Sequence, residues 1–95
     1  MMDAKRFKNK KTENLFLGIA VKGLPADVAR RAKNKLTLVF AASMIDSLRY
    51  PPGNHLEALK GNRKGQWSIR VNNQWRICFE WHNGQAIEIE IVDYH

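Results

Sequence analysis

The second half of the chain alternates apolar and polar residues in three successive stretches, which is the pattern of half-buried β-strands. Two short segments rich in turn-forming residues, 72–74 and 82–84, separate these stretches. We therefore predict an antiparallel β-meander with one apolar face that the rest of the chain must cover. The inward positions are Trp67, Ile69 and Val71 in the first stretch, Trp75, Ile77, Phe79 and Trp81 in the second, and Ile87, Ile89 and Ile91 in the third.

The loop lengths determine the register of this meander, because a slip of one residue moves every side chain to the other face. A three-residue loop at 72–74 places Ile69 opposite Ile77 and keeps the apolar side chains of both strands together. The same register places Arg70 directly opposite Arg76 on the other face. Like charges in that position destabilise a strand pair, and a bound phosphate would relieve the repulsion.

The same reasoning predicts a three-residue loop at 82–84, with Gly84 in the left-handed conformation of a bulged hairpin. In that register Phe79 lies opposite Ile87, and Arg76 lies opposite Glu90. The alternation also places Tyr94 on the face that carries the two arginines.

The first half of the chain has helical periodicity and is expected to cover the apolar face of the sheet. Thr12 is expected to cap a helix over 13–22 that Gly23 ends, and Pro25 is expected at the first position of a second helix. The inward residues are Leu15, Phe16, Ile19 and Ala20 in the first helix, and Val28, Ala32, Leu36, Val39 and Phe40 in the second.

Three shorter segments complete the expected fold. A short strand at 5–8 with Phe7 inward could precede the helices, a helical turn is expected at 42–48, and a loop at 50–54. The fold class is therefore α+β, an N-terminal helical hairpin packed on a C-terminal antiparallel meander. At 95 residues the chain is expected to form a single domain over 1–95.

The net charge of +7 and the pI near 9.9 favour a polyanionic partner, most simply nucleic acid. Residues 1–49 carry eleven Lys or Arg against four acids. Part of this excess lies on the outer side of the second predicted helix, although a solvated charged face would give the same pattern. These helix cations are Arg30, Arg31, Lys33 and Lys35.

Composition also argues against several classes of protein. Cys78 is the single cysteine, and the three histidines have no metal-ligand spacing, so we expect no disulfide framework, metal or cofactor. The sequence shows no secretory pattern and no long apolar run, which predicts a reduced cytoplasmic protein without a membrane segment.

The polar residues of the second half suit metal-independent cleavage of RNA, which needs a base, an acid and donors for the phosphate charge. Lys60, Arg70 and Arg76 could supply the donors. The terminal Asp93-Tyr94-His95 could supply proton transfer and stacking. Structural explanations remain open for each of them, including a simple Arg76–Glu90 pair, a solvated Lys60 and a frayed C-terminus.

The sequence LEALKG-x5-WSIRVNNQWRICFEW together with the closing IEIVDYH resembles the HigB killer toxins of the RelE/ParE superfamily through essentially the whole chain. The resemblance implies a toxin of a bacterial type II toxin–antitoxin pair that cleaves mRNA on the ribosome. It also implies inhibition by a helix-turn-helix antitoxin of the HigA type, with operator DNA bound only through that antitoxin.

The resemblance carries over to named residues. Lys60 matches the family's loop lysine, Arg76 its strand arginine, and the closing tripeptide its acidic-aromatic-histidine set: Asp93, Tyr94 and His95. The family's other histidine lies three residues before the loop lysine, where this chain has Glu57, whereas His55 lies five residues before it. Glu57 could therefore serve as an acid/base group in place of that histidine, or the position could be dispensable, and a role for His55 stays open.

The main expectation is a ribosome-dependent endoribonuclease with catalytic Lys60, Arg76, Asp93, Tyr94 and His95. Arg70 does not match a catalytic position of the family, and its expected role rests on the register argument alone. The expected RNA-binding residues are Arg70, Arg63, Lys64, Arg30, Arg31 and Lys33. The alternatives are a ParE-like inhibitor of DNA gyrase and a catalytically inactive module that binds antitoxin or operator.

Overall fold

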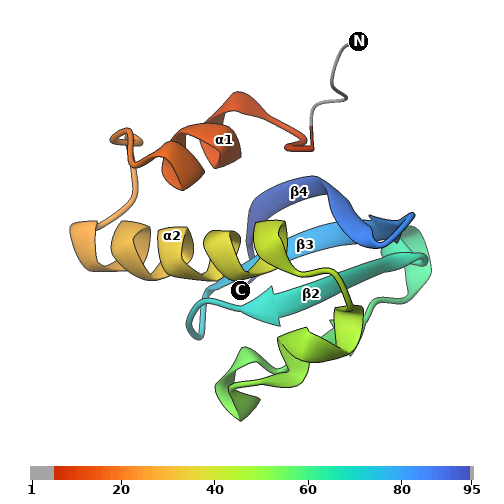
Figure 1. Ribbon diagram of the computed structural model, residues 1–95. Coiled ribbons are helices and arrows are strands. Elements are labelled where there is room, and N and C mark those ends of the chain that lie inside the picture. Colours follow the sequence, from red (N-terminus) through yellow and green to blue (C-terminus); the bar gives the residue numbers. More distant parts are fainter. Residues whose placement is uncertain (1–5, 95) are drawn as a thin grey trace, which may run out of the picture.

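The computed structural model describes residues 6–94, and it consists of two helices packed on a four-stranded antiparallel sheet (Figure 1). The expected α+β class is confirmed. The strands lie in the order β1-β2-β3-β4, and α2 runs across one face of the sheet. The elements are α1 (Lys10–Leu17), α2 (Ala26–Ala41), β1 (Glu57–Ala58), β2 (Gln66–Arg70), β3 (Trp75–His82) and β4 (Gln85–Asp93), with short 3₁₀ segments at Ile45–Arg49, Pro52–Asn54 and Gly61–Arg63.

The predicted limits of the first helix were wrong at both ends. Asn9 caps α1, because its Oδ1 accepts a hydrogen bond from the Thr12 N–H at 3.0 Å. Gly18, with φ of 82°, ends the helix five residues before Gly23. The caps are therefore Asn9 and Gly18 instead of the predicted Thr12 and Gly23.

The second helix follows the prediction closely. Pro25 is the N-cap residue rather than the first helical residue, and α2 ends at Ala41. Its stripe of Val28, Ala32, Leu36 and Val39 is buried, while Phe40 is half-buried. The Phe40 ring packs against two other aromatic rings, Phe7 at 5.6 Å and Phe16 at 4.6 Å between centroids.

The segment before α1 joins the sheet at one position. Phe7 forms a parallel bridge with Ile89, in which the Lys8 N–H donates to the Ile89 carbonyl at 2.8 Å and the Ile89 N–H to the Arg6 carbonyl at 2.9 Å. The expected strand at 5–8 is thus reduced to a bridge, and Lys5 lies outside the described residues.

The first hairpin has the predicted register. Ile69 lies opposite Ile77, Trp67 opposite Phe79, and Arg70 opposite Arg76. The Val71 N–H donates to the Trp75 carbonyl at 2.9 Å across the three-residue turn. This confirms that the two arginines face each other across the strand pair.

The predicted register of the second hairpin was wrong. A two-residue turn, Asn83-Gly84, places His82 opposite Gln85, and both turn residues have positive φ, 52° and 78°. A β-bulge at Glu88, whose φ is 50°, then shifts the register once more. Beyond the bulge Arg76 lies opposite Val92 instead of Glu90, and Ala86 is buried in place of Ile87.

The segment between the helices and the meander contains a strand that was not predicted, β1, which pairs with β2. The buried Asn54 holds the preceding loop in place. Its Nδ2 donates to the carbonyls of Leu48 and Tyr50 at 3.1 and 3.0 Å, and its Oδ1 accepts from Lys35 at 2.5 Å. The loop that leads into β1 is therefore tied to α2.

The core lies between the helices and the odd-numbered residues of β2 and β3, including Ile69, Ile77 and Phe79, all of which are buried. The three tryptophans are partly buried and pack against this core. No helix of the described part of the chain is long and apolar enough to cross a membrane.

Thr12 joins α1 to the last strand from inside the core. Its buried hydroxyl accepts the Ile91 N–H at 3.0 Å and donates to Asn9 Oδ1 at 2.7 Å. Loss of the hydroxyl leaves a buried N–H without this acceptor, which costs about 1–3 kcal/mol.

We predict that Thr12→Val lowers the free energy of unfolding by about 1–3 kcal/mol in urea denaturation. Thr37→Val is the matched control, because the exposed Thr37 hydroxyl donates within α2 to Lys33 and its loss should cost about 0.5 kcal/mol or less. Equal effects of the two substitutions would contradict the assignment.

Candidate functional site

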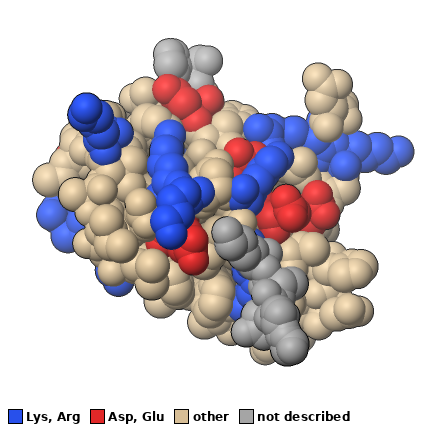
Figure 2. Space-filling view, turned by 90° about the horizontal axis from the view of Figure 1, so that it is seen from above, with Lys and Arg blue, Asp and Glu red and all other residues tan. Residues whose placement is uncertain are grey.

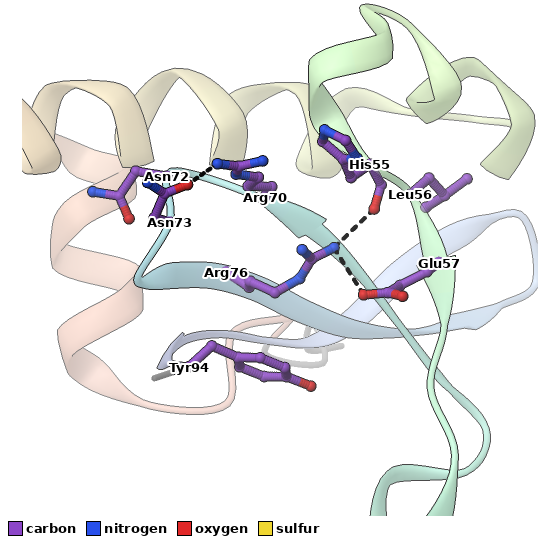
Figure 3. A pocket seen from close by; sticks show the side chains of 8 residues that line it. All are labelled: His55, Leu56, Glu57, Arg70, Asn72, Asn73, Arg76 and Tyr94. Atoms are coloured by element: carbon purple, nitrogen blue, oxygen red, sulfur yellow. Dashed lines mark hydrogen bonds and ion pairs between the residues drawn. The ribbon is translucent and has the colours of Figure 1, made fainter.

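An open groove of about 460 Å³ lies on the sheet near the β2–β3 turn (Figure 3). Its walls come from four places: the chain entering β1, the end of β2, the β2–β3 turn with the start of β3, and the residue after β4. The lining residues are His55, Leu56, Glu57, Arg70, Asn72, Asn73, Arg76 and Tyr94.

Arg76 is held at three points in this groove. Its Nε donates to Ser68 Oγ at 2.8 Å, and its Nη2 donates to the His55 carbonyl at 2.8 Å. The same Nη2 lies 3.3 Å from Oε1 of Glu57. Because the Glu57 side chain is 56 % exposed, this ion pair contributes about 0.2–1 kcal/mol to stability.

Arg70 lies opposite Arg76 but points the other way, toward the turn, as Figure 3 shows. Its Nη2 donates to the side-chain oxygen of Asn73, a neutral acceptor. The two guanidinium groups thus avoid each other by turning toward different ends of the groove, which relieves the repulsion expected for facing like charges.

The Asn-Asn turn is fixed by its own side chains. Oδ1 of Asn72 accepts from the backbone N–H groups of Gln74 at 2.8 Å and Trp75 at 2.7 Å. Sequence reasoning had treated Asn72 and Asn73 as turn residues only and had not expected Leu56 or Ser68 at the site. The alternation of β2 already predicts Ser68 on the arginine face, since residues 68 and 70 share that face, but it does not indicate a role for Ser68 at the site.

Of the terminal set, the structure places Tyr94 in the groove. Its ring lies 5.9 Å from the Arg76 guanidinium carbon, and its N–H donates to the Gln74 carbonyl at 2.5 Å. Asp93 lies opposite Trp75 and accepts from the Gln74 side chain at 3.3 Å, outside the lining of the groove. His95 lies outside the described residues.

The candidates at the far end of the sheet are not brought to the groove. Ala58 pairs with Trp67, and the exposed Lys60 comes two residues after Ala58. Lys60 is therefore separated from Arg70 by roughly 15 Å along the direction of the strands. Arg63 Nη1 lies 3.2 Å from Glu90 Oε1. Burial alone would lower the pKa of Arg63, but the hydrogen bond to Glu90 raises this pKa above its usual value. Lys64 is exposed beside it.

The helix cations form a separate surface. Arg30, Arg31 and Lys33 are exposed on α2 and do not line the groove, whereas Lys35 is committed to Asn54. Figure 2 shows the α1 side of the molecule, on which acidic side chains lie among the basic ones.

Cys78 lies on the arginine face but is fully buried. Burial raises the pKa of the Cys78 thiol, outweighing the opposite effect of the nearby Arg63. The thiol therefore stays protonated and is no candidate nucleophile. No cluster of three or more His, Cys, Asp or Glu suited to a metal occurs within residues 6–94.

The fold and the basic groove define a small α+β protein of the RelE-like type, and comparison with known proteins gives the family. Residues 5–95 match the family described as "RelE-like toxin of type II toxin-antitoxin system HigB". The chain therefore belongs to the HigB-like family of type II toxins. A type II toxin implies a cognate antitoxin as its partner.

Two relatives agree with this assignment. The chain is 37% identical to the "Endoribonuclease HigB" of Proteus vulgaris over 91 residues, which cover 96% of this chain and 98% of the relative. It is 44% identical to "Toxin HigB-1" of Vibrio cholerae over 64 residues, which cover 67% of each chain. The resemblance noted in the sequence is confirmed.

Substitution of each of the two facing arginines by alanine should change the free energy of unfolding differently. Arg70→Ala removes one of two like charges and should leave the free energy of unfolding unchanged or raise it by about 0.5 kcal/mol. Arg76→Ala removes the contacts to Ser68, His55 and Glu57 and should lower it by about 1–3 kcal/mol. Urea denaturation of both variants measures the difference, and a marked loss for Arg70→Ala would show that Arg70 is structural.

Proposed function

We propose that this protein is the endoribonuclease toxin of its toxin–antitoxin pair and that it cuts mRNA on the ribosome. The observation that carries the proposal is the groove in which Arg70, Arg76 and Tyr94 gather, in a chain similar along nearly its whole length to an endoribonuclease HigB. Two guanidinium groups and a phenol are suited to a phosphodiester and an adjacent base.

In the proposed reaction a general base takes the proton of the ribose 2′-hydroxyl, whose oxygen bonds to the neighbouring phosphorus. The bond to the 5′ oxygen breaks, and a general acid protonates that oxygen as it leaves. Arg76, fixed by Ser68 and His55, would stabilise the negative charge that develops on the phosphate. The exposed Tyr94 would stack on a base or donate a proton. From the family pattern we assign the remaining catalytic roles to Lys60, Asp93 and His95, although Lys60 and Asp93 do not line the groove of the free protein.

The division of cations between two surfaces supports dependence on the ribosome. The groove would contact the message, while exposed Arg30, Arg31 and Lys33 on α2, with Lys64, would contact ribosomal RNA through its phosphates. Free RNA would be cut poorly, because the open groove alone does not fix the scissile linkage for in-line attack.

The proposed partners are those expected for a type II toxin of this kind. They are a HigA-like helix-turn-helix antitoxin, the 70S ribosome and its mRNA, with operator DNA contacted only through the antitoxin. The site of action would be the cytoplasm, where translation takes place.

We predict that brief induction of the protein arrests translation and creates new 5′ ends within translated messages, measured by 5′-end mapping. His95→Ala should lower the rate of cleavage by about 10²–10⁴-fold, the range expected for loss of a proton-transfer group.

Two other results would redirect the interpretation. Intact messages with gyrase-dependent DNA damage would indicate a ParE-like inhibitor. Intact messages and normal growth, with retained antitoxin binding, would indicate an inactive binding module.

A further inference from the structure

The carboxylate of Glu57 lies beside the guanidinium of Arg76, with its Oε1 3.3 Å from Nη2. Glu57 belongs to β1, a two-residue strand at the edge of the sheet, and its side chain reaches the groove from there (Figure 3). Arg76 has a 13 % exposed side chain, whereas Glu57 has a 56 % exposed one. The arginine is therefore the fixed member of the pair and the carboxylate is the one that can move away.

Arg76 does not need Glu57 to keep its position. Its Nε is anchored on Ser68 Oγ and its Nη2 on the His55 carbonyl, both at 2.8 Å, and these acceptors are neutral. Removal of the carboxylate leaves the two hydrogen bonds in place and leaves the positive charge uncompensated by Glu57. An incoming phosphate oxygen can then take the position of the carboxylate oxygen with the same charge-assisted geometry.

Arg70 supplies a cation that is bonded to a neutral group. Its hydrogen-bond partner is the Asn73 amide, and both residues line the groove. An anion that enters the groove can therefore engage Arg70 before it has displaced anything charged. Because Arg70 and Arg76 are register partners, one phosphate group lying between them can engage both guanidinium groups once the Arg70 side chain turns from Asn73 toward Arg76.

We propose that Glu57 is a resident counter-ion that occupies the place of a phosphodiester oxygen on Arg76, and that an RNA phosphate binds between Arg70 and Arg76 by displacing it. This rests on the proposed function for the identity of the ligand. It assigns Glu57 the role of a competitor, in contrast to the acid/base role that its position before Lys60 suggested. The free protein thereby holds its groove partly neutralised until RNA enters.

The test measures binding of the free protein to a 2′-O-methyl RNA oligonucleotide, which cannot undergo 2′-hydroxyl attack, by fluorescence anisotropy. Glu57→Gln should lower the dissociation constant roughly two- to fivefold, since an exposed ion pair no longer opposes binding. Glu80→Gln is the matched control. It removes the same charge from the exposed residue 80, four positions along β3 from Arg76, and should have a smaller effect.

Salt dependence tests the second half of the proposal. Arg70→Gln should weaken binding and reduce the slope of log affinity against log salt by about 0.7, the value for one phosphate contact on a single strand. An unchanged slope would overturn the role of Arg70. For Glu57→Gln, weaker binding, or a gain no larger than that of Glu80→Gln, would overturn the counter-ion role.

A cleavage assay on translating ribosomes separates this inference from the proposed function. At sub-saturating message, Glu57→Gln should cut at least as fast as the wild type. Loss of cleavage with unchanged oligonucleotide affinity would show that Glu57 is an acid/base group and would overturn the proposal. If the wild type itself fails to cut, the nuclease function is wrong, whereas the affinity change of Glu57→Gln still tests the counter-ion. Thermal unfolding of each variant verifies that it is folded.

Discussion

The hydrogen bonds of Arg76 are the interactions on which the arrangement of the groove depends. This one side chain connects three segments: Ser68 on β2, the His55 carbonyl before β1, and Glu57 on β1. β1 has two residues, lies at the sheet edge and pairs with β2 alone. The arginine therefore builds one wall of the groove and at the same time places its own charge inside it.

The alternation of the first hairpin was sufficient to predict the arginine pair. The three-residue turn leaves one register that keeps Ile69 and Ile77 on the same face, and this register also pairs Arg70 with Arg76. Burial on the core face thus fixes the positions of charges on the opposite face. The surface that carries the proposed site could therefore be predicted from residues of the core face.

The second hairpin could not be predicted in this way, because two local irregularities changed the register together. The Asn83-Gly84 turn is one residue shorter than expected, and the bulge at Glu88 adds a residue to β4. Nothing in the alternation of Ile87, Ile89 and Ile91 signals a left-handed glutamate between them. The combined shift at Arg76 is two residues, an even number, so Tyr94 kept its predicted face although the partner of Arg76 changed from Glu90 to Val92.

That change of partner determines how the acids are distributed over the sheet. Glu90 does not lie opposite Arg76. Its carboxylate lies 3.5 Å from Lys8 Nζ and 3.2 Å from Arg63 Nη1, and it does not line the groove. Had the predicted register formed, a carboxylate on a central part of β4 would have faced Arg76 across the strand pair, held there by the ladder. Instead the carboxylate that contacts Arg76 belongs to Glu57, whose side chain is exposed and lies on a short edge strand. A partner of that kind can yield to a phosphate at a cost of the order of an exposed ion pair, about 0.2–1 kcal/mol.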